Sequence, residues 1–247
     1  MRNLLPLFLL VFFLIAVQFS SGQTAEDIID KYIDALGGKD RLDAIRSLCF
    51  EGSQDYYGKA ELIKVTLERG KLKRFDIEVN GMKGYWMVTE TKAGEYYPWK
   101  KKDKVAFPDS LVKSLQGNLD ISDRLVNYKN NGGNIKLIRK DSIDNVECYK
   151  ILLTAKTGRS WLYWLDAATY LVMQVEKPYS FTTSTNERFL AQDITSYKNY
   201  RSVDGIMFAY TEQTRTLINK KEVAIKATYY NNIEINKPVD PRLYELR

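Results

Sequence analysis

Hydrophobic residues between positions 24 and 36 recur every three or four residues, which predicts an amphipathic helix. The apolar stripe of this helix consists of Ile28, Ile29, Tyr32, Ile33 and Leu36. Thr24 followed by Asp27 is typical of a capping box at a helix start, and Gly37-Gly38 is typical of a helix end. The spacing predicts a second, shorter helix over about 40–48.

From Cys49 onward the hydrophobic period shortens to two, which indicates strands with one buried face. Turn residues separate the strands of the first half, at Arg69-Gly70-Lys71, Asn80-Gly81 and Ala93-Gly94. Later strands are expected at about 135–140, 146–155, 160–166, 170–177, 187–200, 206–218 and 222–235. Such a succession predicts an antiparallel meander in an α+β, mainly β, fold.

The strand pattern lapses between residues 108 and 133. Pro108-Asp109 is a plausible helix start, followed on one face by Leu111, Val112 and Leu115. Gly117-Asn118 breaks the pattern, and a second short helical piece is predicted from Ile121, Leu125 and Val126. We expect amphipathic helices inserted in this way to pack on the sheet.

The first residues of the chain are expected to lie outside the fold. Leu4–Val17 is an apolar run of 14 residues that follows Arg2, and Ser20-Ser21-Gly22 supplies small residues after it. This pattern predicts a secretory signal peptide over residues 1–22, cleaved at its end. The alternative, a retained anchor, is disfavoured because a bilayer span needs about 20 residues. Residues 23–247 contain no Pro/Ser-rich linker, so a single domain is expected.

The charge pattern disfavours a nucleic-acid partner. Removing Arg2 with the signal peptide lowers the formal charge from +6 to +5, and the remaining charges are mixed in sign. A nucleic-acid binder instead gathers Lys and Arg on one face. The dense basic run at 100–104 follows the aromatic stretch 96–99 and is interpreted as a solvated loop. Its alternative role is contact with acidic lipid headgroups or a partner.

The side-chain inventory offers little catalytic chemistry. The chain has no histidine, which removes the usual base of Ser–His and Cys–His nucleophile pairs. Cys49 and Cys148 lie in apolar surroundings, so either a disulfide or two buried thiols would fit. Without histidine they make a poor zinc ligand set. We expect no enzyme activity, metal or cofactor, although an acid–base pair of carboxylates stays open.

A strand-and-turn pattern in the second half is more specific. Tyr149-Lys150 closes one strand segment, Asp166 ends the next, and Thr169-Tyr170-Leu171 opens a third. Farther on, Tyr197-Lys198 runs into Val203-Asp204-Gly205 and an apolar strand. These motifs resemble the LolA-like family of exported bacterial proteins, which includes outer-membrane lipoprotein-sorting carriers.

The resemblance extends to both ends of the chain. The helix pair at 25–48 and the C-terminal stretch 233–246 are similar to those of the family, whereas 52–131 matches only in style. The resemblance implies an open, strongly curved antiparallel half-barrel with helices on its concave face. It also implies a periplasmic, monomeric protein of a Gram-negative bacterium that holds acyl chains of a lipoprotein or lipid. The family carrier latches its lid with an arginine that no motif places here.

The hairpin around Asp166 supplies the predicted sheet side of this ligand site. Alternation places Leu162, Trp164, Leu171 and Met173 on one non-polar face, and Trp161, Tyr163, Leu165 and Tyr170 on the other. The first face is predicted to be concave, although one extra loop residue would exchange the two faces. The lid side is assigned to Ile29, Ile33, Leu111 and Leu115. The alternative is an envelope interaction or sensor module of the same fold with a filled core, able to dock membrane proteins.

Overall fold

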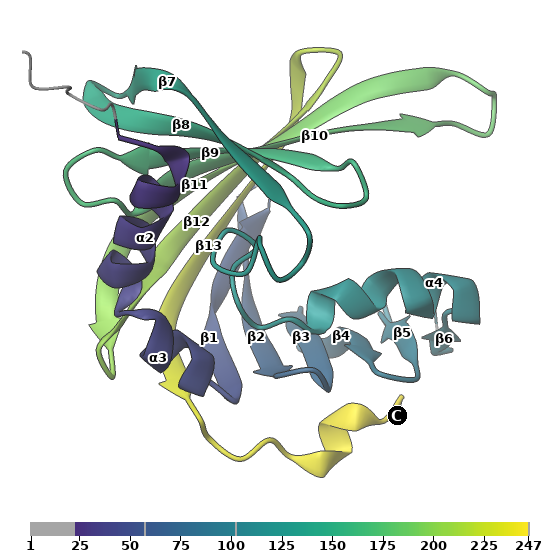
Figure 1. Cartoon of the computed structure of the whole chain (residues 1–247). Helices are drawn as coiled ribbons and strands as arrows, with labels where there is room; N and C mark the ends of the chain where they lie inside the picture. Colours follow the sequence, from purple (N-terminus) through teal and green to yellow (C-terminus); the bar gives the residue numbers. More distant parts are fainter. Residues whose placement is uncertain (1–22, 57, 102, 247) are drawn as a thin grey trace, which may run out of the picture.

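A computed structural model describes residues 23–56, 58–101 and 103–246 (Figure 1). These residues form one 13-stranded antiparallel sheet with a few helices, in the order β6-β5-β4-β3-β2-β1-β13-β12-β11-β10-β9-β8-β7. The sheet is open and strongly curved, and α2 crosses its concave face (Figure 1). The predicted mainly β, half-barrel fold is therefore confirmed. The predicted signal peptide lies outside the described residues.

Two meanders meet at the pairing of β1 with β13. The first contains β1 (Ser47–Tyr56), β2 (Lys59–Glu68), β3 (Leu72–Val79), β4 (Met82–Thr89), β5 (Ala93–Tyr96) and β6 (Val105–Ala106). The second contains β7 (Asn134–Ile143), β8 (Val146–Thr154), β9 (Ser160–Asp166), β10 (Val172–Thr182), β11 (Arg188–Val203), β12 (Ile206–Ile218) and β13 (Lys221–Ile235). All seven strands predicted for the second half are present. Within the described ranges, no helix is long and apolar enough to cross a membrane.

One predicted turn is wrong. Ala93-Gly94 lies inside β5, and the chain reverses instead at residues 90–92, where the Lys92 amide donates to Thr89 Oγ1 at 3.1 Å. Gly94 is needed for close strand approach, since an added Cβ would lie 2.4 Å from the carbonyl oxygen of Val105. The glycine thus marks tight packing between β5 and β6.

Helix α2 (Ala25–Leu36) is confirmed with both of its predicted ends. The Thr24 side chain accepts from the Asp27 amide at 3.1 Å, and the Asp27 carboxylate accepts from the Thr24 amide at 2.9 Å. The predicted second helix is shorter than expected: α3 spans Lys39–Ala44. Leu48 is recruited into β1, where it pairs with Ile235, so sheet pairing ends the helix early.

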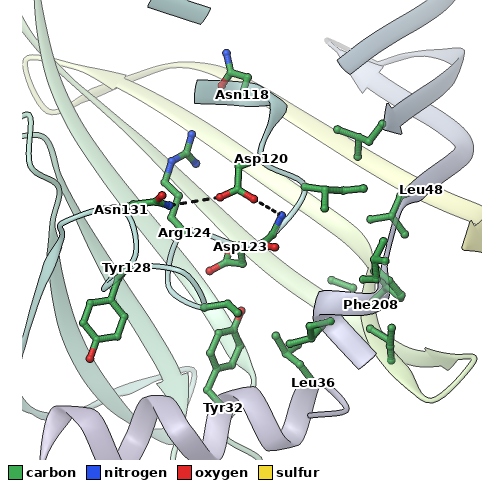
Figure 2. A pocket seen from close by; sticks show the side chains of 18 of the residues that line it. Tyr32, Leu36, Leu48, Asn118, Asp120, Asp123, Arg124, Tyr128, Asn131 and Phe208 are labelled. Atoms are coloured by element: carbon green, nitrogen blue, oxygen red, sulfur yellow. Dashed lines mark hydrogen bonds between the residues drawn. The ribbon is translucent and has the colours of Figure 1, made fainter. Parts of the chain in front are cut away.

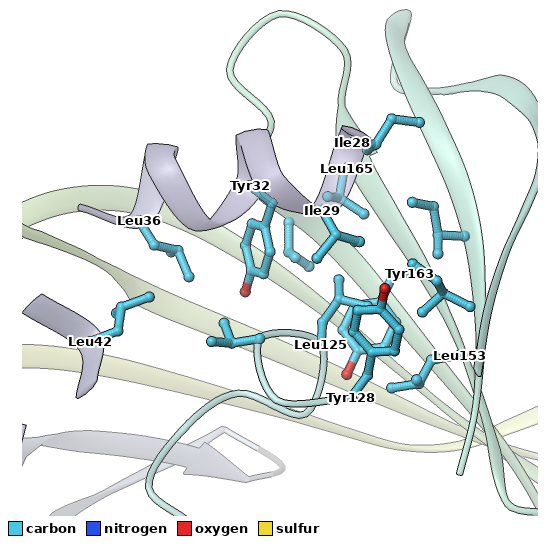
Figure 3. Packing of buried hydrophobic residues seen from close by; sticks show 14 of the residues in the cluster. Ile28, Ile29, Tyr32, Leu36, Leu42, Leu125, Tyr128, Leu153, Tyr163 and Leu165 are labelled. Carbon is cyan, nitrogen blue, oxygen red and sulfur yellow. The ribbon is translucent and has the colours of Figure 1, made fainter. Parts of the chain in front are cut away.

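The core lies between α2 and the concave face of strands β7–β12. Figure 3 shows the buried α2 side chains directed toward Leu125, Leu153, Tyr163 and Leu165. Ile28 and Leu165 are fully buried, and burying a side chain of this size stabilises the fold by roughly 1.5–3 kcal/mol. Helix α2 thus packs tightly against one part of the concave face of the sheet.

The 108–133 insert lies farther along the sheet. Its helix α4 (Asp109–Leu115) continues into the 3-10 turn η1 (Gln116–Leu119), and together they pack Val112 and Leu119 on β4 and β5. The predicted second helical piece is wrong, because residues 120–133 form turns. The Asp123 carboxylate accepts from the Leu125 amide at 2.7 Å, a local bond that competes with helix formation.

The turn after α2 is a close contact between two distant segments, and it yields a stability prediction. Gly37 has φ +122°, and an added Cβ would lie 2.2 Å from the Gly205 carbonyl oxygen in the β11–β12 turn. We expect Gly37→Ala to lower the free energy of unfolding by at least about 2 kcal/mol, because backbone strain and the clash combine. Gly38→Ala is the control, since Gly38 also has positive φ but faces open space. Chemical denaturation of both variants measures the difference, and equal losses would contradict the contact.

Candidate ligand-binding hollow

An open volume of about 610 Å³ lies between the concave face of the sheet, α2, α3 and residues 116–133. Figure 2 shows its apolar part near Leu36, Leu48 and Phe208, and its polar part near Asp120 and Asp123. Ligand sites in proteins commonly have volumes of about 300–1,000 Å³. The hollow therefore has room for a small amphiphilic molecule.

The apolar end of the hollow is built where α2 and α3 meet β1 and β12. Leu36, Leu42 and Leu48 contribute aliphatic surface there, and Phe50 packs edge-on to Phe208 with ring centroids 5.9 Å apart. These side chains face one another because the curved sheet brings its strands around the helices. A hydrocarbon chain placed here would lose contact with water on most sides.

The other end of the hollow carries charge. Lys73 from β3, Glu212 from β12 and the loop residues Asp123 and Arg124 all line it. Burial raises the pKa of the Glu212 carboxyl, opposed by the positive charges of Lys226 and Lys73. Burial likewise lowers the pKa of the Lys73 ammonium. A charged end of this kind was not predicted from the alternation pattern, which marks Lys73 and Glu212 only as polar strand residues.

The 116–133 segment divides the hollow. A second volume of about 350 Å³ lies on the β9–β13 side, and it shares Tyr32, Asp123, Arg124 and Tyr197 with the first. Asp120 accepts from the Ser122 amide at 3.0 Å and from Asn131 at 3.4 Å, which shapes this partition (Figure 2). Beyond the 3-10 turn η1, the partition is thus held by turn hydrogen bonds.

Arg69 joins the pieces that cover the hollow. Its guanidinium donates to the carbonyl oxygens of Ile45 at 2.7 Å and Leu42 at 2.9 Å, at the end of α3. It also donates to Ser122 Oγ at 3.2 Å, in the partition segment. One side chain at the β2–β3 turn therefore ties α3 and the partition to the sheet. The sequence marked Arg69 only as part of a turn, because its partners are backbone carbonyls that leave no motif.

Solved structures with this architecture identify the fold. The sequence matches no protein-family model and no curated protein. A DUF1329 family protein of Desulfovibrio piger is similar with a TM-score of 0.57 and 14% identity, covering 92% of this chain and 100% of that one. A LolA superfamily protein of Nitrosomonas europaea gives a TM-score of 0.54 and 12% identity, covering 90% and 98%. The chain has a LolA-like fold.

A third neighbour agrees. A putative outer membrane lipoprotein-sorting protein domain of Vibrio parahaemolyticus gives a TM-score of 0.53 and 10% identity, covering 87% of this chain and 95% of that one. The resemblance seen in the strand-and-turn motifs is therefore confirmed for the fold. At sequence identities of 10–14%, these similarities show a shared fold. The class of ligand is therefore inferred from the residues that line the hollow.

The prediction for the Asp166 hairpin is wrong about which face is concave. The face predicted to be convex is the one that lies against α2. Trp161, Tyr163 and Leu165 join the core beneath the helix, whereas Leu162 and Trp164 point away from it. Trp164 Nε1 donates to Glu176 at 2.8 Å, on the outer face. The register slips at Met173, where a bulge separates Val172 from Gln174. A bulge changes the alternation locally, which the strand pattern alone did not reveal.

The predicted site residues are consequently not brought together. Ile29 is buried in the core, and Ile33 and Leu171 pack partly buried against it. Leu115 packs with the α4 cluster on β4 and β5, while Leu111 is 40% exposed. The outer-face residues do not line the hollow, and neither do the two α4 residues. The outer-face residues are Leu162, Trp164 and Met173.

The two cysteines are unpaired, which decides between the two alternatives. Cys148 is fully buried on the outer side of β8, with its Sγ 3.5 Å from Met173 Sδ. Cys49 lies on β1 beside Lys64 and Glu51, and burial raises the pKa of its thiol. Across the described ranges, no cluster of three or more His, Cys, Asp or Glu side chains could hold a metal ion.

The charged end gives a pH-dependent prediction. Because burial raises the pKa of Glu212 above its ordinary value of 4.5, the ionised form destabilises the fold at neutral pH. We expect Glu212→Gln to raise the free energy of unfolding at pH 7. The gain should shrink as pH falls and vanish below about 4.5, where the wild-type carboxyl is protonated in both states. Urea denaturation between pH 4 and 8 measures this, and a pH-independent difference would contradict it.

Proposed function

We propose that this LolA-like chain is an exported, non-catalytic binding protein that holds the acyl chain of a lipoprotein or lipid. The main support for this proposal is the open volume of about 610 Å³, which is apolar where α2 and α3 meet the sheet. The lipoprotein-sorting neighbour from Vibrio parahaemolyticus, which this chain resembles in fold alone, supports the same ligand class. An open hollow favours this function over an interaction or sensor module with a filled core.

The binding step follows from the cover of the hollow. The acyl chain would lie against Leu36, Leu48 and Phe208, which are already in place. Widening the entrance would require α3 and the partition to move apart, and Arg69 holds both. We infer that Arg69 acts as the latch of this cover, because it bonds to α3 and to the partition at once. The energy that keeps α3 and the partition together would then lie in a few hydrogen bonds.

The proposal also covers the domain organisation, the location and the partners of the protein. Residues 23–247 would act as one monomeric domain in the periplasm after removal of residues 1–22. Partners would be an acylated lipoprotein or lipid and, at transfer, envelope membrane proteins. Catalysis is not required, because Asp123 is engaged by the Leu125 amide and the charges that act on Glu212 are those of Lys226 and Lys73. The exposed lysines Lys100, Lys101 and Lys104 fit the solvated loop expected there.

A fluorescence titration with quencher-labelled fatty acids tests the proposal. Trp161 lines the hollow, whereas Trp164 lies three residues along β9 on the outer face. We expect saturable quenching that survives Trp164→Phe and is largely lost in Trp161→Phe. Quenching that is absent in the wild type, or equal in both variants, would overturn the proposal.

A further inference from the structure

Two opposite charges face the hollow without direct partners. Lys73 lies on the inner face of β3 and Glu212 on that of β12, four strands along the sheet order. Four strand spacings are about 19 Å along a flat sheet, yet Lys73 and Glu212 line the same open volume. Sheet curvature therefore directs both side chains into one space.

These two groups are unpaired within the residues that the structure describes. No ion pair or hydrogen bond links either Lys73 or Glu212 to a neighbouring side chain, although other charges in the hollow are engaged. Asp123 accepts a backbone amide, and Arg124 lies over the Trp161 ring with its guanidinium carbon 5.1 Å from the centroid. Lys73 and Glu212 thus remain as the groups that a ligand could satisfy.

The surroundings of Glu212 suit a cation. Tyr197 lies directly opposite Glu212 on β11, and Thr228 lies opposite it on β13. Tyr197 lines the hollow, where its ring and neutral hydroxyl are available to a ligand. An amine placed here would meet a carboxylate, a hydroxyl and an aromatic ring.

We propose that the hollow selects amphiphiles with a zwitterionic headgroup, its phosphate on Lys73 and its amine on Glu212. This inference rests on the proposed function, because the hydrocarbon chain would occupy the apolar end near Leu36 and Phe208. A singly charged headgroup would satisfy one protein charge and leave the other desolvated and unpaired. A zwitterion satisfies both, which makes head-group charge the basis of selectivity.

Four probes with one common hydrocarbon chain test this selectivity. They are lysophosphatidylethanolamine, lysophosphatidic acid, a monoacylglycerol and an alkylamine, titrated below their micelle concentrations. We expect lysophosphatidylethanolamine to bind at least about tenfold more tightly than any of the others, since charged hydrogen bonds have large effects when buried. Calorimetry or the Trp161 signal gives the dissociation constants.

Charge-removing variants assign the two halves of the headgroup. Glu212→Gln should abolish the preference over lysophosphatidic acid, and Lys73→Met should abolish the preference over the alkylamine. Both variants should be at least as stable as the wild type at pH 7, because each removes a charge disfavoured by burial. The outer-face pair Lys64–Glu51, joined at 2.7 Å, supplies the controls Lys64→Met and Glu51→Gln, which should change no affinity.

The outcomes separate the two proposals. Equal binding of all four probes, unchanged by Glu212→Gln and Lys73→Met, would overturn zwitterion selection and leave acyl-chain binding intact. It would mean that water alone solvates the two charges. Failure of every probe to bind would overturn the proposed function itself.

Discussion

Replacing Arg69 with alanine is expected to loosen the cover of the hollow. The variant loses donors to the Leu42 and Ile45 carbonyl oxygens and to Ser122 Oγ, all of them partly buried contacts. An unmet hydrogen-bonding group costs about 1–3 kcal/mol, so we expect a loss of about 2–4 kcal/mol in unfolding free energy. Amide exchange should accelerate in α3 and in residues 119–133, while β8 and β9 keep their protection.

Arg46→Ala is the matched control for this change. Arg46 is exposed and lies near the end of α3, and its guanidinium donates to the Asp43 carbonyl oxygen at 3.3 Å. We expect it to leave exchange in residues 119–133 unchanged. Arg69→Lys should be intermediate, because lysine keeps the charge without the forked donor geometry. Amide exchange that accelerates uniformly across the sheet, or not at all in α3, would contradict the role of Arg69 as the latch.

Filling the hollow is expected to abolish acyl-chain binding. Ala209 lies on β12 beside Phe208 and lines the open volume of about 610 Å³. A tryptophan at this position would occupy space that a hydrocarbon chain needs, so Ala209→Trp should weaken fatty-acid affinity at least about tenfold. Because the space is open, stability should change by less than about 1.5 kcal/mol.

The control places the same bulk on the exposed surface. Ala60 is an exposed residue near the start of β2, so Ala60→Trp should bind fatty acid as the wild type does. Isothermal calorimetry of both variants makes the comparison, with circular dichroism as a check on folding. Unaltered affinity in a folded Ala209→Trp variant would place the ligand elsewhere.

The sequence predicted strands better than it predicted their orientation. Alternation located β8 to β13 and helix α2, because each buries one regular face against the other. The bulge at Met173 changes the alternation only within β10, so it does not decide which face of β9 meets α2. A period of two assigns residues to two faces and does not say which is concave.

The site itself was harder to predict because it depends on long-range contacts. Arg69 binds backbone carbonyl oxygens, which every residue type possesses, so the sequence carries no complementary pattern. Lys73 and Glu212 are 139 positions apart and line the same volume only because the sheet is curved. The shortened α3 has the same origin, since pairing of Leu48 with Ile235 overrides local helical spacing.

Native mass spectrometry of the chain, purified from a bacterial envelope extract without detergent, tests acyl-chain binding most directly. We expect an adduct with the mass of an acylated molecule that dissociates intact on activation. The adduct should be missing from Ala209→Trp and retained by Ala60→Trp. A wild-type chain that carries no acylated adduct, even after incubation with lysophospholipid, would contradict the central claim.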